Sequence, residues 1–104
     1  MEKVKSGARE AAARVIKELE TADVFSIAEA CGLRVVYESW FPVTFGEFDR
    51  RRKTIVVNLS APESRVLIIA HELGHYFARD LNLTNAEQET FAHAFAERLT
   101  ADEN

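Results

Sequence analysis

Two features that would direct a chain to a particular compartment are scarce in this sequence. Cys31 is the only cysteine among 104 residues, so an intrachain disulfide is impossible and nothing suggests an oxidising compartment. No apolar run approaches the length of a signal-peptide core or a membrane span. We therefore expect a cytoplasmic protein that does not associate with a membrane.

The sequence also lacks an excess of basic residues. Lys and Arg total 13 against 17 Asp and Glu, which gives a net charge of -4. Such a chain has no general attraction for a phosphate backbone. The one basic cluster, residues 50–53 (RRRK), stands between two expected strands, and we interpret it as a solvated turn rather than a nucleic-acid patch. Direct binding of nucleic acid is not expected.

What the sequence does contain is the composition of a folded protein. Hydrophobic residues make up 47% and charged residues 29%, a balance typical of soluble globular domains. The length is that of one domain, and there are no repeats, linkers or low-complexity segments. We therefore expect residues 1–104 to form a single domain.

The first half of the chain predicts a helical pair followed by a small sheet. Residues 1–32 contain a helix-forming stretch at about 6–20 and a shorter helix that begins at Asp23, turns Phe25 and Ile27 inward and ends at Gly32. Residues 33–59 contain three β-rich runs, at 33–38, 44–49 and 53–59, and the first two are separated by residues 40–42 (WFP). A three-stranded sheet is expected.

The second half predicts two helices with similar start signals. Ser60 and Glu63 have capping-box spacing and predict a helix over residues 60–80. Thr84 and Glu87 repeat the pattern and predict a helix over residues 84–100. The packed side of this last helix is expected to consist of Ala92, Phe95, Ala96 and Leu99. Together these elements indicate an α+β fold.

Residues 71–75 read HELGH. On a helix His71 and His75 are one turn apart, so both imidazoles project from one face and can chelate a cation. Neutral imidazole suits zinc (Zn2+), which in catalytic sites keeps three protein ligands and a water. Glu72 lies about 100° round the helix from His71, beside the open position, where it would act as the general base. Gly74 either permits a close approach of another segment or is simply tolerated.

The third ligand is expected on the last helix. Glu89 and His93 stand at i, i+4 within a stripe of apolar and small residues (ETFAHAFA), and polar groups in such surroundings need partners. We assign Glu89 as the metal ligand and expect His93 to lie just outside the ligands and to hydrogen-bond a liganding imidazole or Glu89 itself. The exchanged assignment, with His93 as ligand and Glu89 orienting it, remains open.

Residues 46–96 resemble the ImmA/IrrE family of bacterial and phage metallopeptidases. The matching motifs are Gly46-Glu47-Phe48, the strand 55–58 (IVVN), Pro62, Glu63 and Arg65, residues 70–75 (AHELGH), and Glu89, Ala92, Phe95 and Ala96. The resemblance implies a minimal zincin-like fold of the thermolysin-like clan, with zinc held by both histidines and Glu89. It also implies site-specific cleavage of a helix-turn-helix repressor or similar regulator of a phage or mobile element.

The chain departs from the family pattern in two places. The family usually has asparagine at the position of His93, and a Leu-Leu-Met-Pro-like stretch where this chain ends in polar ADEN. No added DNA-binding or sensory domain is expected, so we interpret the chain as a catalytic domain standing alone.

Three features of function stay open at this point. The substrate is expected to lie along a sheet edge, formed by residues 53–59 or 44–49. The oxyanion-stabilising group is expected among Tyr37, Tyr76, His93 and the arginines. The rival functions are a metal-stabilised regulatory or toxin-antitoxin type binding protein that does not cleave, and a regulator with an empty site. Glu72 favours the enzyme, because a structural zinc site is closed by four protein ligands and needs no general base.

Overall fold

The computed structural model describes residues 1–40 and 45–101. The helices are α1 (Glu2–Leu19), α2 (Val24–Ala30), α3 (Arg65–Phe77) and α4 (Asn85–Leu99), and the strands are β1 (Arg34–Glu38), β2 (Gly46–Asp49) and β3 (Thr54–Asn58). This is the expected α+β composition. The predicted start of the second strand at residue 44, the break at residues 41 and 42, and residues 102–104 at the polar end lie outside the described residues.

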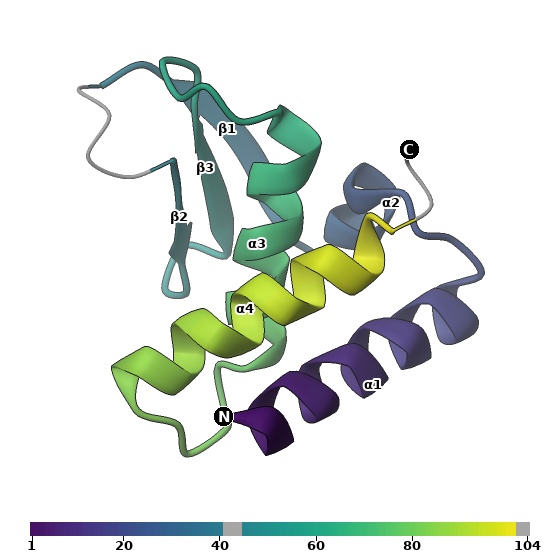
Figure 1. Ribbon diagram of the computed structural model, residues 1–104. Coiled ribbons are helices and arrows are strands. Elements are labelled where there is room, and N and C mark those ends of the chain that lie inside the picture. The colour runs from purple at the N-terminus through teal and green to yellow at the C-terminus, as the bar shows by residue number, and fades with distance from the viewer. Residues whose placement is uncertain (41–44, 102–104) are drawn as a thin grey trace.

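The elements are arranged in layers around α3. Figure 1 shows the sheet on one side of α3 and α4 on the other, with α1 running beside α4. Apolar side chains from every layer meet in one core, and α3 contributes several of the most deeply buried ones. The largest fully buried apolar side chains are Val24, Ile27, Ile55, Val57, Ile69, Leu73, Phe95 and Leu99. The packed side expected for the last helix is confirmed, because Ala92, Phe95, Ala96 and Leu99 are all buried.

The sheet has the strand order β1-β3-β2. β1 pairs with β3 in parallel, and β2 pairs with β3 antiparallel through the turn at residues 50–53, which confirms the interpretation of the basic cluster as a turn. β3 is therefore the central strand, in keeping with its mostly buried residues. Residues 53–59 are thus excluded as a sheet edge, and β2, from the other candidate segment, is an edge strand.

Both predicted ends of α2 are confirmed. The Asp23 carboxylate accepts hydrogen bonds from the backbone N–H groups of Phe25 and Ser26. At the other end Gly32 has a φ of +72°, a left-handed conformation that glycine adopts at low cost. The predicted inward position of Phe25 is wrong, because its side chain is 43% exposed. The buried stripe of α2 consists instead of Val24, Ile27 and Ala28, which share one face at i, i+3 and i+4.

The predicted start of α3 at Ser60 is also wrong. The N-cap is Ser64, whose hydroxyl accepts a hydrogen bond from the Leu67 N–H at 3.1 Å. The Ser60 N–H instead donates to the Asn58 side-chain oxygen at 3.0 Å, so the chain turns after β3 before the helix begins. The capping box of α4 is confirmed: Thr84 and Glu87 exchange side-chain to backbone hydrogen bonds of 3.1 and 2.9 Å. The start of α4 is therefore well defined.

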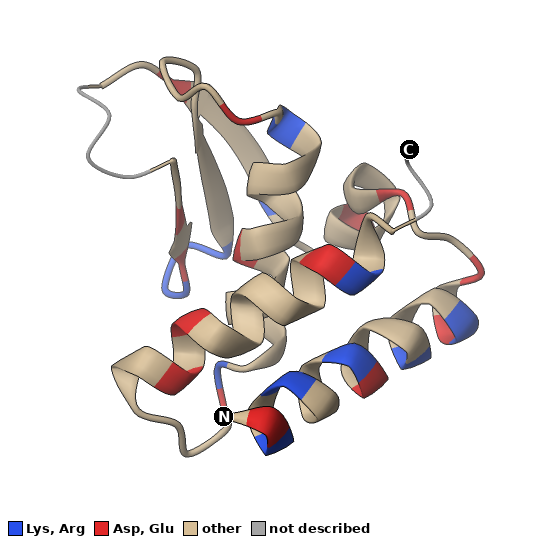
Figure 2. Cartoon of the chain, in the orientation of Figure 1, with Lys and Arg blue, Asp and Glu red and all other residues tan. Residues whose placement is uncertain are grey.

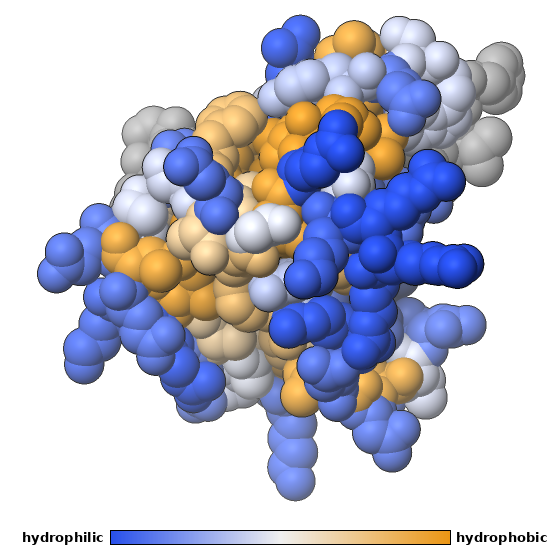
Figure 3. Space-filling model, turned by 180° about the vertical axis from the view of Figure 1, so that it is seen from behind, coloured by the Kyte–Doolittle hydropathy of each residue, from blue (hydrophilic) through white to orange (hydrophobic). Residues whose placement is uncertain are grey.

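Charged and apolar side chains are distributed as in a water-exposed domain. In Figure 2 many of the charged residues lie on α1, and basic residues occupy the β2–β3 turn. Seen from behind in Figure 3, hydrophilic side chains interrupt the apolar areas of the surface. No helix within residues 1–40 and 45–101 combines the length and the apolar character needed to cross a bilayer.

Candidate active site

α3 presents both histidines of HELGH on one face. Ile69 and Leu73 bury the opposite face of the helix completely, which turns His71 and His75 toward solvent. The two ring centroids are 5.0 Å apart, and the side chains are 30% and 21% exposed. The one-turn spacing therefore brings the imidazoles together as expected, in a position that is partly buried and still accessible.

Glu89 of α4 lies against both imidazoles. His71 Nε2 is 3.1 Å from Glu89 Oε2, and His75 Nε2 is 3.4 Å from Glu89 Oε1. In tetrahedral zinc coordination, with ligand bonds near 2 Å, neighbouring ligand atoms are about 3.3 Å apart. His71, His75 and Glu89 each offer a ligand atom within 4.8 Å of the others, so this group could hold a metal ion. The donor set and its spacing fit the predicted ligands, and Glu89 rather than His93 is the third member.

The close contact of α3 with α4 explains how Glu89 reaches the histidines. A Cβ atom added to Gly74 would lie 2.6 Å from the Ala92 Cα and 3.0 Å from the Ala92 carbonyl oxygen. Only glycine leaves room for the two backbones at this separation. The close-approach interpretation of Gly74 is therefore confirmed, and the alternative of a merely tolerated glycine is wrong. Ala92 is one turn after Glu89, so this contact lays the beginning of α4 across the histidines.

The surroundings of His71 favour its neutral form. Burial is the main cause that lowers the pKa of His71, and the nearby His75 lowers it further, whereas Glu89 opposes the shift. A neutral imidazole offers a lone pair to a cation, and a protonated one does not. The lowered pKa of His71 therefore favours the form that a metal site requires.

Glu72 lies beside this group without belonging to it. Its side chain is buried, with 6% of the residue exposed. Burial, followed by the negative charges of Glu89 and Glu47, raises the pKa of Glu72 to about 8. A carboxylate with that affinity for protons suits the general-base role predicted from the sequence.

A cleft of about 840 Å³ opens between β2, α3 and α4. His71, Glu72, His75 and Glu89 line it on the helical side, and residues 45–48 line it on the strand side. A Cβ atom added to Gly46 would lie 2.6 Å from Ile68 Cγ2 and 3.3 Å from Glu72 Cγ. The edge strand therefore runs directly against the face of α3 that holds the functional residues.

His93 does not occupy the position expected for it. Its side chain is 72% exposed, and its Nε2 atom lies 3.6 Å from Glu97 Oε1 on the same helix. Among the described residues it makes no hydrogen bond to His71, His75 or Glu89. His93 is four residues after Glu89 and four before Glu97, and its exposed ring lies beside Glu97. The predicted hydrogen bond from His93 to a liganding imidazole or to Glu89 is therefore wrong for the described residues.

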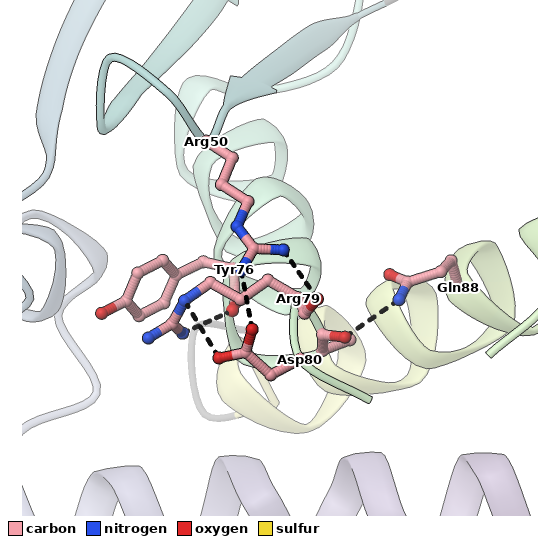
Figure 4. Close-up of polar contacts among 6 residues, drawn as sticks. Arg50, Tyr76, Arg79, Asp80 and Gln88 are labelled. Atoms are coloured by element: carbon pink, nitrogen blue, oxygen red, sulfur yellow. Dashed lines mark hydrogen bonds and ion pairs between the residues drawn. The ribbon is translucent and has the colours of Figure 1, made fainter. Parts of the chain in front are cut away.

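Gln88 makes the contact that was expected of His93. Its Oε1 atom is 3.5 Å from His75 Nδ1. Its Nε2 atom donates a hydrogen bond to the Ala78 carbonyl at the end of α3, at a distance of 2.9 Å (Figure 4). The sequence contained a signal for this residue. Gln88 stands three and seven residues before Phe91 and Phe95, on the buried stripe of α4, where a polar side chain needs a partner.

Some of the residues expected to stabilise the oxyanion line the cleft, and others do not. Tyr37 and Tyr76 are not among the described residues that line the cleft, whereas His93, Arg50 and Arg79 are. The Tyr37 ring lies under the Arg65 guanidinium, 5.1 Å away, and Tyr76 packs edge-on against Phe48. His93, Arg50 and Arg79 are therefore the candidates whose position at the cleft suits this role.

Cys31 lies apart from this chemistry. It is partly buried and contacts the core, and burial raises the pKa of its thiol. A raised pKa disfavours the reactive thiolate. This environment suits a small apolar side chain better than a nucleophile.

Comparison with known proteins identifies the family. Residues 28–104 match the model of peptidase family M78, described as the IrrE N-terminal-like domain. No curated protein matches the chain. The matched region covers most of the chain and includes the sheet, the HELGH helix and the helix with Glu89. The chain therefore belongs to the ImmA/IrrE family of metallopeptidases.

Proposed function

We propose that the chain is a zinc-dependent endopeptidase in which His71, His75 and Glu89 hold the metal and Glu72 is the general base. The observation on which this rests is the arrangement of these four side chains in one cleft. Three of them offer ligand atoms to one point, and the fourth lies beside them with a raised pKa. A structural zinc site would use four protein ligands and would have no reason to bury a separate carboxylate next to them.

Zinc suits the donor set better than other common divalent ions. Two imidazoles and one carboxylate form the ligand set of many catalytic zinc sites, whereas Mg2+ and Ca2+ prefer oxygen ligands. When bound, zinc would acidify a water molecule and polarise the carbonyl of the scissile peptide bond. The part of Glu72 is to accept the proton of that water at its carboxylate and to deliver it to the leaving amine.

The edge strand β2 provides a docking site for the substrate backbone. β2 pairs with β3 on one side and with no strand of the described residues on the other, and its residues 46–48 line the cleft. An extended peptide can therefore add to β2 as a further strand, with its backbone groups paired to the free N–H and C=O groups of the edge. Gly46 keeps this edge close to Glu72, so a peptide on β2 would present a carbonyl to the catalytic group.

We propose that the substrate is a helix-turn-helix repressor or a similar regulator of a phage or mobile element, cleaved in the cytoplasm. The family resemblance suggests this class of partner, and the charge of the cleft supports it. Five glutamates line the cleft, namely Glu47, Glu63 and Glu97 besides Glu72 and Glu89, against two arginines, Arg50 and Arg79. DNA-binding regulators have basic surfaces, and an acidic cleft attracts basic segments.

The test uses purified protein loaded with zinc. It measures cleavage of a helix-turn-helix repressor whose gene lies near the gene of this protein. We expect Glu72→Gln to lower the cleavage rate by about 10²- to 10⁴-fold, which is the usual contribution of a general base. The variant should still bind zinc, because Glu72 is not one of the ligands. His71→Ala serves as the contrast and should lose both zinc and activity.

The same variant separates cleavage from the alternative function. A metal-stabilised binding protein that sequesters a regulator, or acts in a toxin-antitoxin pair, would keep its biological effect in Glu72→Gln. If Glu72→Gln relieves repression as well as the parent does, while no cleaved fragment is found, the endopeptidase proposal is wrong.

A further inference from the structure

Gln88 links the end of α3 to one of the two imidazoles. Its side chain is partly buried between α4 and α3, next in sequence to Glu89. The amide nitrogen donates to the Ala78 carbonyl at 2.9 Å, and the amide oxygen lies 3.5 Å from His75 Nδ1. His71 has no comparable side-chain partner for its Nδ1 atom among the described residues. The two imidazoles of the site are therefore held differently.

The orientation of the Gln88 amide follows from its partners. A backbone carbonyl can only accept a hydrogen bond, so the NH₂ group of Gln88 must face Ala78. The amide oxygen then faces His75, and an amide oxygen is also only an acceptor. The hydrogen bond to His75 therefore requires a proton on Nδ1. In a neutral imidazole this leaves the lone pair on Nε2, the atom that lies 3.4 Å from Glu89 Oε1.

The Ala78 carbonyl is a firm anchor for this arrangement. Ala78 is fully buried at the C-cap of α3. The turn that follows is held by Arg50, which donates to the Arg79 carbonyl at 3.1 Å and to Asp80 Oδ1 at 2.7 Å. Figure 4 shows these contacts from the β2–β3 turn meeting the end of α3 beside Gln88. Gln88 thus connects His75 to a part of the backbone with several independent supports.

We infer that Gln88 is a positioning residue that fixes the tautomer and ring orientation of His75 so that Nε2 faces the metal. The inference rests on the proposed zinc site. Residues that hydrogen-bond the second nitrogen of a liganding histidine typically change metal affinity by 10- to 100-fold when replaced. Because the contact to Nδ1 is long, at 3.5 Å, we expect an effect near the lower end of that range.

The first experiment measures zinc affinity of the metal-free protein by competition with a chelator. Gln88→Met keeps the length and helix propensity of the side chain and removes both amide groups. It should weaken zinc binding by about tenfold. Gln88→Glu keeps an oxygen that accepts from Nδ1–H and loses the donor to Ala78, and it should bind zinc within about threefold of the parent. Asn85→Ala, at the start of α4 and not among the residues that line the cleft, is the control and should equal the parent.

The second experiment needs no metal. Nitrogen-15 chemical shifts of the imidazoles, measured at a pH where they are neutral, report which ring nitrogen bears the proton. The parent should show His75 protonated at Nδ1, Gln88→Met should show a mixture of tautomers, and His71 should not change between the two. A general structural disturbance would alter both histidines, so the contrast isolates the effect on His75.

The outcomes distinguish this inference from the proposed function. If Gln88→Met binds zinc like the parent with an unchanged His75 tautomer, Gln88 has no positioning role, and the zinc site stands. If Gln88→Glu is as weak as Gln88→Met, the amide acts as a brace between helices and the inference is overturned. If the parent takes up no zinc, the proposed function fails, and the tautomer measurement alone decides whether Gln88 orients His75.

Discussion

The two helices of the site hold their metal-binding side chains in opposite ways. His71 and His75 stand on α3, whose other face is packed in the core between the sheet and α4. Glu89 stands on α4 with a mostly exposed side chain. Core packing therefore orients the histidines, whereas the position of Glu89 depends on where α4 lies across α3. Packing in the core thus positions the two histidines of the site, whereas a contact between two helices positions Glu89.

Among the variants that test this difference between the two helices, Glu89→Ala is expected to change zinc affinity the most. Removal of a ligand should lower zinc affinity by more than the 10- to 100-fold typical of outer partners, because one of three protein donors is lost. The stability of the metal-free protein should change by no more than about 0.5 kcal/mol, since the side chain is exposed. Chelator competition and urea unfolding measure the two quantities.

Glu97→Ala is the matched control for this experiment. Glu97 is on the same helix, is similarly exposed and also faces a histidine, but it is not in the group that could hold a metal. It should leave zinc affinity unchanged. Equal zinc affinity of Glu89→Ala and the parent would show that the third ligand is a different residue.

A smaller effect, on stability as well as on the site, is expected from Gly74→Ala. The added methyl group would overlap the backbone of Ala92, which cannot move as a side chain does, so the helices must separate. Such overpacking typically costs about 1–3 kcal/mol of the free energy of unfolding. Displacement of α4 should also weaken zinc binding, because it moves Glu89 relative to the histidines.

Gly7→Ala provides the reference for the same chemical change. Gly7 is inside α1, and a Cβ atom there meets nothing within 4 Å. Alanine should stabilise this helix by up to about 1 kcal/mol. Urea unfolding of both variants should therefore give shifts of opposite sign. If both variants are stabilised, the backbones of α3 and α4 are not in the contact described.

The smallest effect concerns the start of α4 and depends on pH. Hydrogen bonds from the Thr84 backbone and then its side chain hold the pKa of Glu87 below its ordinary value. A carboxyl group with a lowered pKa in the folded state stabilises the protein above its unfolded pKa, and that contribution disappears as the pH falls through the lowered value. Glu87→Gln, which can still cap but carries no charge, should be less stable than the parent at neutral pH.

Thermal unfolding between pH 7 and pH 3 measures this difference. The gap between the parent and Glu87→Gln should close toward the acidic end. Thr84→Ala should instead remain less stable at every pH, by about 1 kcal/mol, because it lacks the hydroxyl cap. A gap between the parent and Glu87→Gln that stays constant with pH would show that the charge of Glu87 does not support the start of α4.

Local patterns predicted those features that depend on neighbours in sequence. The placement of His71, Glu72 and His75 followed from helical spacing, and the Thr84 cap from a four-residue signal. The same signal at Ser60 was misleading. The side chain of Asn58 accepts a hydrogen bond from the Ser60 N–H, so the chain turns here. The helix begins only after its N-cap Ser64. A capping pattern in sequence cannot show that another part of the chain already uses one of its donors.

The choice among polar residues on α4 shows a similar limit. Gln88, Glu89 and His93 are all polar and all near the HELGH helix, and sequence spacing alone favoured the last two. The structure brings Gln88 against His75 and leaves His93 beside Glu97. The apolar stripe predicted the packed side of α4, but which of its polar residues meets the histidines depends on how α4 lies across α3 at the Gly74–Ala92 contact.

The sequence by itself determined the element types, the α+β class, and a histidine pair with a glutamate beside it on one helix. Periodicity and capping depend on residues that are close together in the sequence, so most of these signals can be interpreted without the tertiary structure. Only the tertiary structure decided the central place of β3, the edge position of β2, and the meeting of Glu89 with the imidazoles. These features depend on pairing and packing between segments that are distant in the sequence. The free energy of such contacts comes from the whole core, so no single stretch of the chain reveals it.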